Sequence, residues 1–143
     1  MIVKKYFISL HRPTLYFITG LPGAGKSTYA EKIKKEKKIQ EHFEADHWMT
    51  DGKNNYFFNP SKLFFCHKQC IEKTELSMKQ NKSVIVSNTS LTKKEALPYF
   101  NLAKKFQYNI ELIHLQTEYQ SIHNVPIEKI KLMKQKRQIY DIN

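Results

Sequence analysis

Gly20-Leu21-Pro22-Gly23-Ala24-Gly25-Lys26-Ser27 is the stretch of this 143-residue chain that decides its fold. It matches the pattern G-x-x-x-x-G-K-[ST], in which glycine-rich backbone surrounds phosphate groups. The pattern requires a buried strand before the loop and a helix after it. The apolar run 15–19 precedes the loop, and an amphipathic segment from Lys26 to about Ile39 follows it. We therefore interpret residues 20–25 as a phosphate-binding loop between a strand and a helix.

Each part of this loop has a chemical task in nucleotide binding. Glycine lets backbone N–H groups approach a β-phosphate, and the N-terminus of the following helix points at the same oxygens. Lys26 supplies positive charge for the β- and γ-phosphates, and Ser27 supplies an oxygen ligand for Mg²⁺. The sequence therefore predicts ATP and Mg²⁺ as the cofactors, with no motif that distinguishes ATP from GTP. The predicted nucleotide-binding residues are Gly20, Leu21, Pro22, Gly23, Ala24, Gly25, Lys26, Ser27 and Thr28.

Strand-like and helix-like segments alternate through the rest of the chain. Further strands are expected at 42–46, 83–86 and 109–115, and further helices from Asn59-Pro60, from Thr92, and from Pro126 to about Tyr140. Residues 1–13 are expected to form an N-terminal arm or an extra strand. The alternation predicts a single α/β domain over 1–143, a three-layer P-loop sandwich with a small, mostly parallel sheet.

Three details of these helices can be checked against a structure. Pro98 lies inside one predicted helix and is expected to kink it. Cys66 and Cys70 lie on the apolar stripe of another helix, and we interpret them as core residues rather than metal ligands. The last helix is expected to turn Ile127, Ile130 and Met133 inward.

Composition limits the class of protein. The net charge of +11 is typical of proteins with anionic partners, but a lysine-rich composition alone would also produce it. No apolar run reaches the ~20 residues of a membrane-spanning helix, and the N-terminus lacks the features of a signal peptide. Two cysteines cannot form a disulfide framework. We expect a cytoplasmic protein without a membrane partner; the oligomeric state is not legible.

Asp46 is the candidate catalytic base. In parallel sheets the ligand crevice lies outside the carboxyl ends of the strands, which brings the loops 20–25, 46–58 and 87–92 together. Asp46 ends a predicted strand in that crevice, where a carboxylate can accept the proton of an attacking hydroxyl. Asp51 precedes a glycine and is interpreted as a turn residue.

Four aromatic residues follow Asp46 along the chain: Trp48, Tyr56, Phe57 and Phe58. Aromatic side chains at a crevice can stack on the bases of single-stranded nucleic acid. They can also pack beneath the loop and hold Asp46 in place. We favour packing, because three consecutive aromatic side chains rarely all face solvent.

Four segments carry a resemblance to a known family. They are 20–28, 45–48, 84–99 (with Val84-Ile85-Val86-Ser87-Asn88-Thr89 at its start) and 122–130. In these segments and in their order, the chain resembles the P-loop kinase family that includes bacteriophage 5′-polynucleotide kinase and the kinase-like domain of Nedd4-binding proteins. The resemblance implies transfer of a γ-phosphate to a hydroxyl, with a nucleic-acid 5′ end as the acceptor partner.

The same resemblance implies roles for individual residues. Asp46 falls on the general base, and Ser87, Asn88 and Thr89 fall on a strand-end motif on the acceptor side. His47 is a candidate substrate contact beside Asp46, and the segment 116–124 falls on a lid over the triphosphate.

The chain departs from the family at two places. The strand-end motif usually contains an aspartate, whereas Ser87 and Asn88 provide no carboxylate. The lid usually carries an arginine where Gln120-Ser121 stand here, and Arg137 is the one arginine in the second half of the chain. Two further hypotheses therefore stay open: a kinase of a nucleoside, a modified DNA base or a sugar-like metabolite, and a nucleotide-binding module without catalysis.

Overall fold

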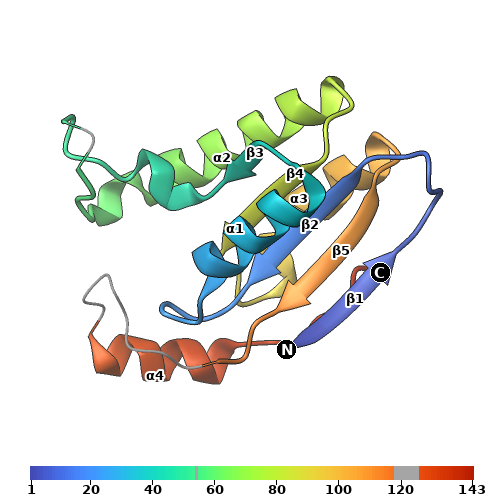
Figure 1. Cartoon of the computed structure of the whole chain (residues 1–143). Helices are drawn as coiled ribbons and strands as arrows, with labels where there is room; N and C mark the ends of the chain where they lie inside the picture. Colours follow the sequence, from blue (N-terminus) through green and yellow to red (C-terminus); the bar gives the residue numbers. More distant parts are fainter. Residues whose placement is uncertain (54, 118–125) are drawn as a thin grey trace.

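A five-stranded sheet forms the centre of the protein in a computed structural model, which describes residues 1–53, 55–117 and 126–143 (Figure 1). The strands are β1 (Ile2–Tyr6), β2 (Thr14–Thr19), β3 (Glu41–Phe43), β4 (Val84–Asn88) and β5 (Asn109–His114). Their spatial order is β1-β5-β2-β4-β3, with β1 antiparallel to β5 and the other neighbours parallel. The extra N-terminal strand and the mostly parallel sheet are confirmed.

Successive side chains of β2 point to opposite faces of the sheet. Both sets are apolar, and helices cover both faces. Leu15 and Phe17 pack in one core with α2 (Leu63–Lys79) and α3 (Lys93–Lys105). Tyr16 and Ile18 pack in a second core with α1 (Lys26–Lys37) on the other face. The result is the predicted three-layer α/β sandwich, with Cys70 in the first core and Cys66 buried beside it.

The N-terminal arm is tied down by one buried side chain. The Asn109 carboxamide oxygen accepts hydrogen bonds from the N–H groups of Ile8 and Ser9. Its amide nitrogen donates to the carbonyls of Ser9 and Arg12. These four bonds satisfy both ends of the side chain, which places β1 along β5 and leads the chain into β2.

Two predicted elements differ from the structure. The second strand ends at Phe43, and residues 45–48 form a short 3₁₀ helix, η1 (Ala45–Trp48), so Asp46 lies on a turn beyond the strand. The last helix, α4 (Ile127–Lys136), ends before residue 140 and has no buried residue. The prediction that Ile127 faces inward is wrong, since it is 72% exposed.

The chain after α4 contributes to the core in place of the helix. Tyr140 and Ile142 are buried against α3 and the sheet. Pro98 does lie inside α3, and the helix continues through it to Lys105. None of the helices among the described residues combines the length and apolar character needed to cross a bilayer.

Candidate functional site

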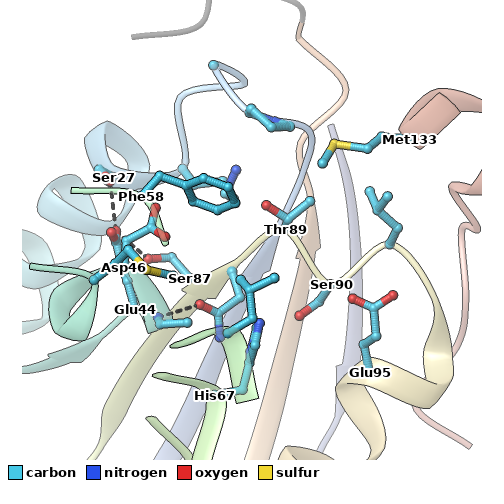
Figure 2. A pocket seen from close by; sticks show the side chains of 18 of the residues that line it. Ser27, Glu44, Asp46, Phe58, His67, Ser87, Thr89, Ser90, Glu95 and Met133 are labelled. Atoms are coloured by element: carbon cyan, nitrogen blue, oxygen red, sulfur yellow. Dashed lines mark hydrogen bonds between the residues drawn. The ribbon is translucent and has the colours of Figure 1, made fainter. Parts of the chain in front are cut away.

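A cavity of about 700 Å³ opens at the carboxyl ends of β2, β3 and β4 (Figure 2). The phosphate loop forms one wall, and Figure 2 shows Ser27, Glu44, Asp46 and Ser87 together on one side with Met133 opposite. Its lining includes these predicted site residues: Pro22, Gly23, Gly25, Lys26, Ser27, Thr28, Asp46, Ser87, Asn88 and Thr89. Segments far apart in the sequence therefore meet in one site.

The phosphate loop requires glycine at three positions for two different reasons. Gly23 and Gly25 have φ angles of 81° and 91°, in the left-handed region that disfavours a side chain. At Gly20 a Cβ atom would lie 3.1 Å from the Leu115 carbonyl oxygen and 3.0 Å from the Ala24 Cβ. Leu21 and Ala24 also belong to the loop, and their side chains are buried. Gly20, Leu21 and Ala24 thus shape the loop from behind the cavity.

Lys26 lies folded against the loop that it follows. Its Nζ donates hydrogen bonds to the carbonyls of Gly20 and Leu21, both at 3.0 Å. Burial lowers the pKa of Lys26 to about 8, while the charges of Glu44 and Asp46 oppose that shift. The ammonium group is partly desolvated and close to two carboxylates, so a bound polyphosphate would favour its charged form.

Glu44 is the centre of a hydrogen-bond network that joins the phosphate loop to β4. Its Oε1 accepts from Ser27 Oγ and Ser87 Oγ, each at 2.7 Å, and lies 3.2 Å from His42 Nε2. Burial raises the pKa of Glu44, but the hydrogen bonds from His42, Ser87 and Ser27 outweigh burial and lower the pKa to about 2. A charged carboxylate therefore stands directly beside the Ser27 hydroxyl. A hydroxyl and a carboxylate are the hard oxygen donors that suit Mg²⁺.

Asn88 holds the turn that carries Asp46. Its Oδ1 accepts a hydrogen bond from the Ala45 N–H at 2.8 Å, and its Nδ2 donates to Tyr99 Oη at 3.3 Å and to Cys70 Sγ at 3.6 Å. Asn88 is only 5% exposed, and its polar atoms are engaged by the protein. The strand-end residue predicted on the acceptor side thus also fixes the backbone beside Asp46.

His47 does not belong to the cavity lining. Its Nδ1 accepts from the Glu44 N–H at 3.3 Å, and its Nε2 lies 3.9 Å from Glu44 Oε2. Burial lowers the pKa of His47. The ring lies against Glu44 and outside the cavity lining, and its contact with substrate stays a prediction.

The far side of the cavity is apolar and aromatic. Met49, Tyr56, Phe58 and Leu63 line it from the loop after Asp46 and from the start of α2. The prediction that all four aromatic residues pack beneath this loop is wrong. Trp48 packs against the core, but Tyr56, Phe57 and Phe58 are 43%, 59% and 43% exposed. They are exposed because Met49 and Cys66 already fill the space under the loop.

Helix α4 lies next to the aromatic side of the cavity. Lys129 Nζ lies 4.9 Å from the centre of the Phe58 ring, within the range of a cation–π contact. Pro126, Lys129 and Met133 line the cavity, as do Glu95 from α3 and His67 from α2. The lining of the cavity therefore includes both positively charged side chains, such as Lys129, and negatively charged ones, such as Glu95.

Residues 118–124 of the predicted lid (116–124) lie outside the described residues. They include Gln120-Ser121, which stand where the family usually has an arginine. Within the ranges that the structure describes, no group of three or more His, Cys, Asp or Glu side chains could hold a metal ion on its own.

Glu44, His67 and Lys129 are site residues that the sequence reasoning missed. The sequence signal for Glu44 was only its position, a carboxylate two residues before Asp46 in the predicted strand 42–46. His67 had none, since it lies on a helix with no motif at that position, whereas Lys129 lies in the segment 122–130 that carries the resemblance but had no role assigned to it. Their part in the cavity follows from the packing of α2 and α4 around the sheet ends.

Comparison with known proteins gives a family and a fold. A family model described as "AAA domain" matches residues 15–136. A chain in the structure of the Pnkp1/Rnl/Hen1 complex, elsewhere described as an RNA repair complex, superposes with a TM-score of 0.63 at 17% identity. That match covers 87% of this chain but 40% of the other, so this chain spans less than half the length of that relative.

Two smaller enzymes share the fold. A gluconokinase from Sinorhizobium meliloti has a TM-score of 0.59 at 14% identity, covering 90% of this chain and 77% of that one. The APS kinase of Mycobacterium tuberculosis, in complex with AMPPNP and APS, has a TM-score of 0.53 at 13% identity, covering 85% and 68%. The protein therefore belongs to this AAA domain family and has the P-loop kinase-like fold.

Proposed function

We propose that the protein is an ATP-dependent kinase that moves a γ-phosphate to a hydroxyl acceptor, with the 5′-hydroxyl of a polynucleotide as the preferred acceptor. One observation carries this proposal: Lys26 and Ser27 of the phosphate loop line the same cavity as Asp46. A nucleotide held by the loop would present its phosphates to the space that Asp46 faces. Phosphoryl transfer depends mainly on such positioning and on charge neutralisation.

The residues divide the reaction into binding and proton transfer. Backbone N–H groups of the loop bind the phosphates, and Lys26 exchanges its carbonyl partners at Gly20 and Leu21 for phosphate oxygens. Asp46 accepts the proton of the acceptor hydroxyl as its oxygen bonds to the γ-phosphorus. The bond from that phosphorus to the β–γ bridging oxygen breaks, and a nucleoside diphosphate leaves. Mg²⁺, held through Ser27, would neutralise charge on the phosphate oxygens.

The cavity rim supports a polynucleotide as the acceptor. Tyr56 and Phe58 line the cavity and keep 43% of their surface exposed, as rings that stack on bases must. The net charge of +11 favours a polyanionic partner. The likeness to a chain of the Pnkp1/Rnl/Hen1 complex, although it extends to the fold alone, is in keeping with this acceptor.

A small hydroxyl compound is the second candidate acceptor. The cavity volume of about 700 Å³ is in the range of small-molecule sites, and His67 and Glu95 offer polar groups in its lining. The gluconokinase and the APS kinase that share the fold carry names of small acceptors. Either acceptor would use Lys26 and Asp46 in the same way.

The proposal is tested by transfer of labelled γ-phosphate from ATP to a single-stranded 5′-hydroxyl oligonucleotide, with gluconate and APS as parallel acceptors. We expect label on the oligonucleotide, loss of transfer in Lys26→Ala, and wild-type transfer in Lys35→Ala, an exposed lysine on the same helix. Label on gluconate or APS alone would identify a small acceptor. Nucleotide binding with no transfer to any acceptor would contradict the kinase proposal.

A further inference from the structure

The feature behind this inference is the position of Glu44 between the phosphate loop and β4. The Glu44 side chain is 16% exposed and stands directly after β3. Its Oε1 receives the hydroxyls of Ser27 and Ser87 at 2.7 Å and lies 3.2 Å from His42 Nε2. Three side chains from separate parts of the chain thus converge on one carboxylate oxygen.

The direction of these hydrogen bonds matters for a cation. A serine hydroxyl has one proton and two lone pairs. Ser27 gives its proton to Glu44, so its lone pairs point away from Glu44 and are available to a metal ion. Ser87 also gives its proton to Glu44, and its oxygen lies 2.7 Å from His42 Nε2. His42 and Ser87 therefore hold Glu44 in place, and Glu44 in turn orients Ser27.

We propose that Glu44 supplies the carboxylate of the magnesium site from the end of β3, at the point where the strand-end residues of β4 have none. Glu44 is a positioning residue in this account: it orients the Ser27 hydroxyl and adds negative charge beside it. The inference rests on the proposed binding of a magnesium nucleotide. Its geometric basis is the direct contact of Glu44 Oε1 with both Ser27 Oγ and Ser87 Oγ.

The test separates metal binding from nucleotide binding. The affinity for the ATP analogue AMPPNP is measured by calorimetry with Mg²⁺ and with a chelator, and the ratio of the two affinities is the magnesium enhancement. We expect Glu44→Gln to reduce the enhancement at least tenfold while the metal-free affinity stays within twofold. Glu41→Gln is the matched control, a carboxylate on β3 that lies 3.8 Å from Lys82, and it should leave both affinities unchanged.

A double substitution tests the location of the charge directly. Ser87 Oγ and Glu44 Oε1 lie within hydrogen-bond distance, so an aspartate at position 87 would place a carboxylate in nearly the same space. We expect Glu44→Gln combined with Ser87→Asp to restore the enhancement to within threefold of wild type. Glu44→Asp, which keeps the charge with a shorter reach, should give an intermediate enhancement, and it decides the question if Glu44→Gln does not fold.

Wild-type enhancement in Glu44→Gln or in Glu44→Asp would overturn the inference. Equal losses of metal-free and magnesium-dependent affinity would overturn it too, because they would show that Glu44 only supports the loop. If wild-type protein binds AMPPNP under neither condition, the proposed function itself fails, and that outcome is distinguishable from a failure of Glu44 alone.

Discussion

At the scale of single residues, Lys26 makes nucleotide binding depend on pH. Burial lowers its pKa to about 8, so the free protein loses this positive charge as the pH rises above 8, whereas bound phosphate favours the charged form. We expect AMPPNP affinity to be constant below pH 7 and to fall about tenfold between pH 7 and pH 9. A fluorescence titration across this range measures the effect. Lys26→Ala should bind weakly at every pH, and a flat wild-type profile would contradict the assignment.

Asn88 gives a second prediction for a single residue, concerning stability. Asn88→Ala removes the oxygen that accepts the hydrogen bond of the Ala45 N–H. Ala45 is buried and directly precedes Asp46. An unsatisfied buried donor costs about 1–3 kcal/mol, so we expect the free energy of unfolding in urea to fall by that amount. The Ala45 amide should also exchange with solvent faster. A loss below about 0.5 kcal/mol would show that water or another group replaces the carboxamide.

The phosphate loop could be predicted residue by residue, because its chemistry is local. Gly23, Gly25, Lys26 and Ser27 act through the backbone and the side chains of one short segment. Glu44 could not be assigned in the same way. Its role depends on the meeting of the phosphate loop, the end of β3 and β4, and only the fold brings these segments together.

At the scale of secondary-structure elements, the segment after α4 places Tyr140 and Ile142 in the core, whereas α4 itself has no buried residue. Tyr140 is 6% exposed, its hydroxyl donates to the Ser90 carbonyl at 2.8 Å, and its ring packs edge-on against His114 at 4.8 Å. We expect Tyr140→Ala to lower the free energy of unfolding by about 3–5 kcal/mol.

Tyr140→Phe is the control for this prediction. It keeps the buried ring and loses one hydrogen bond, which should cost about 1 kcal/mol in the same urea titration. Similar stabilities of Tyr140→Ala and wild type would mean that this segment does not pack into the core.

The errors made from the sequence also lie at this scale, and they have physical causes. An apolar stripe at helical spacing predicted that α4 packs inward, but a stripe does not reveal whether another segment fills the core first, as Tyr140 and Ile142 do. The aromatic loop was predicted to be buried because three consecutive aromatic side chains rarely all face solvent. Met49 and Cys66 occupy the space below it. The buried strands were easier to predict, because buried parallel strands form continuous apolar runs.

At the scale of the whole molecule, the net charge of +11 makes the salt dependence of binding a test between the two acceptor classes. Binding that neutralises phosphates releases counterions, so affinity for a nucleic acid falls steeply with salt. For a single-stranded 5′-hydroxyl oligonucleotide we expect the affinity to fall about tenfold or more between 50 and 200 mM salt. Fluorescence anisotropy of a labelled oligonucleotide measures this slope. An affinity independent of salt would count against a polynucleotide and favour a small acceptor in the same cavity.

The measurement that tests the central claim most directly compares Asp46→Asn with wild type in two assays on the same samples. One assay is AMPPNP affinity, and the other is the rate of γ-phosphate transfer from ATP to the 5′-hydroxyl oligonucleotide in a single turnover. If Asp46 is the base in the cavity shared with Lys26, the variant binds nucleotide as well as wild type and transfers at least 100-fold more slowly, as loss of a general base requires (~10²–10⁴). An unchanged transfer rate in Asp46→Asn would contradict the account.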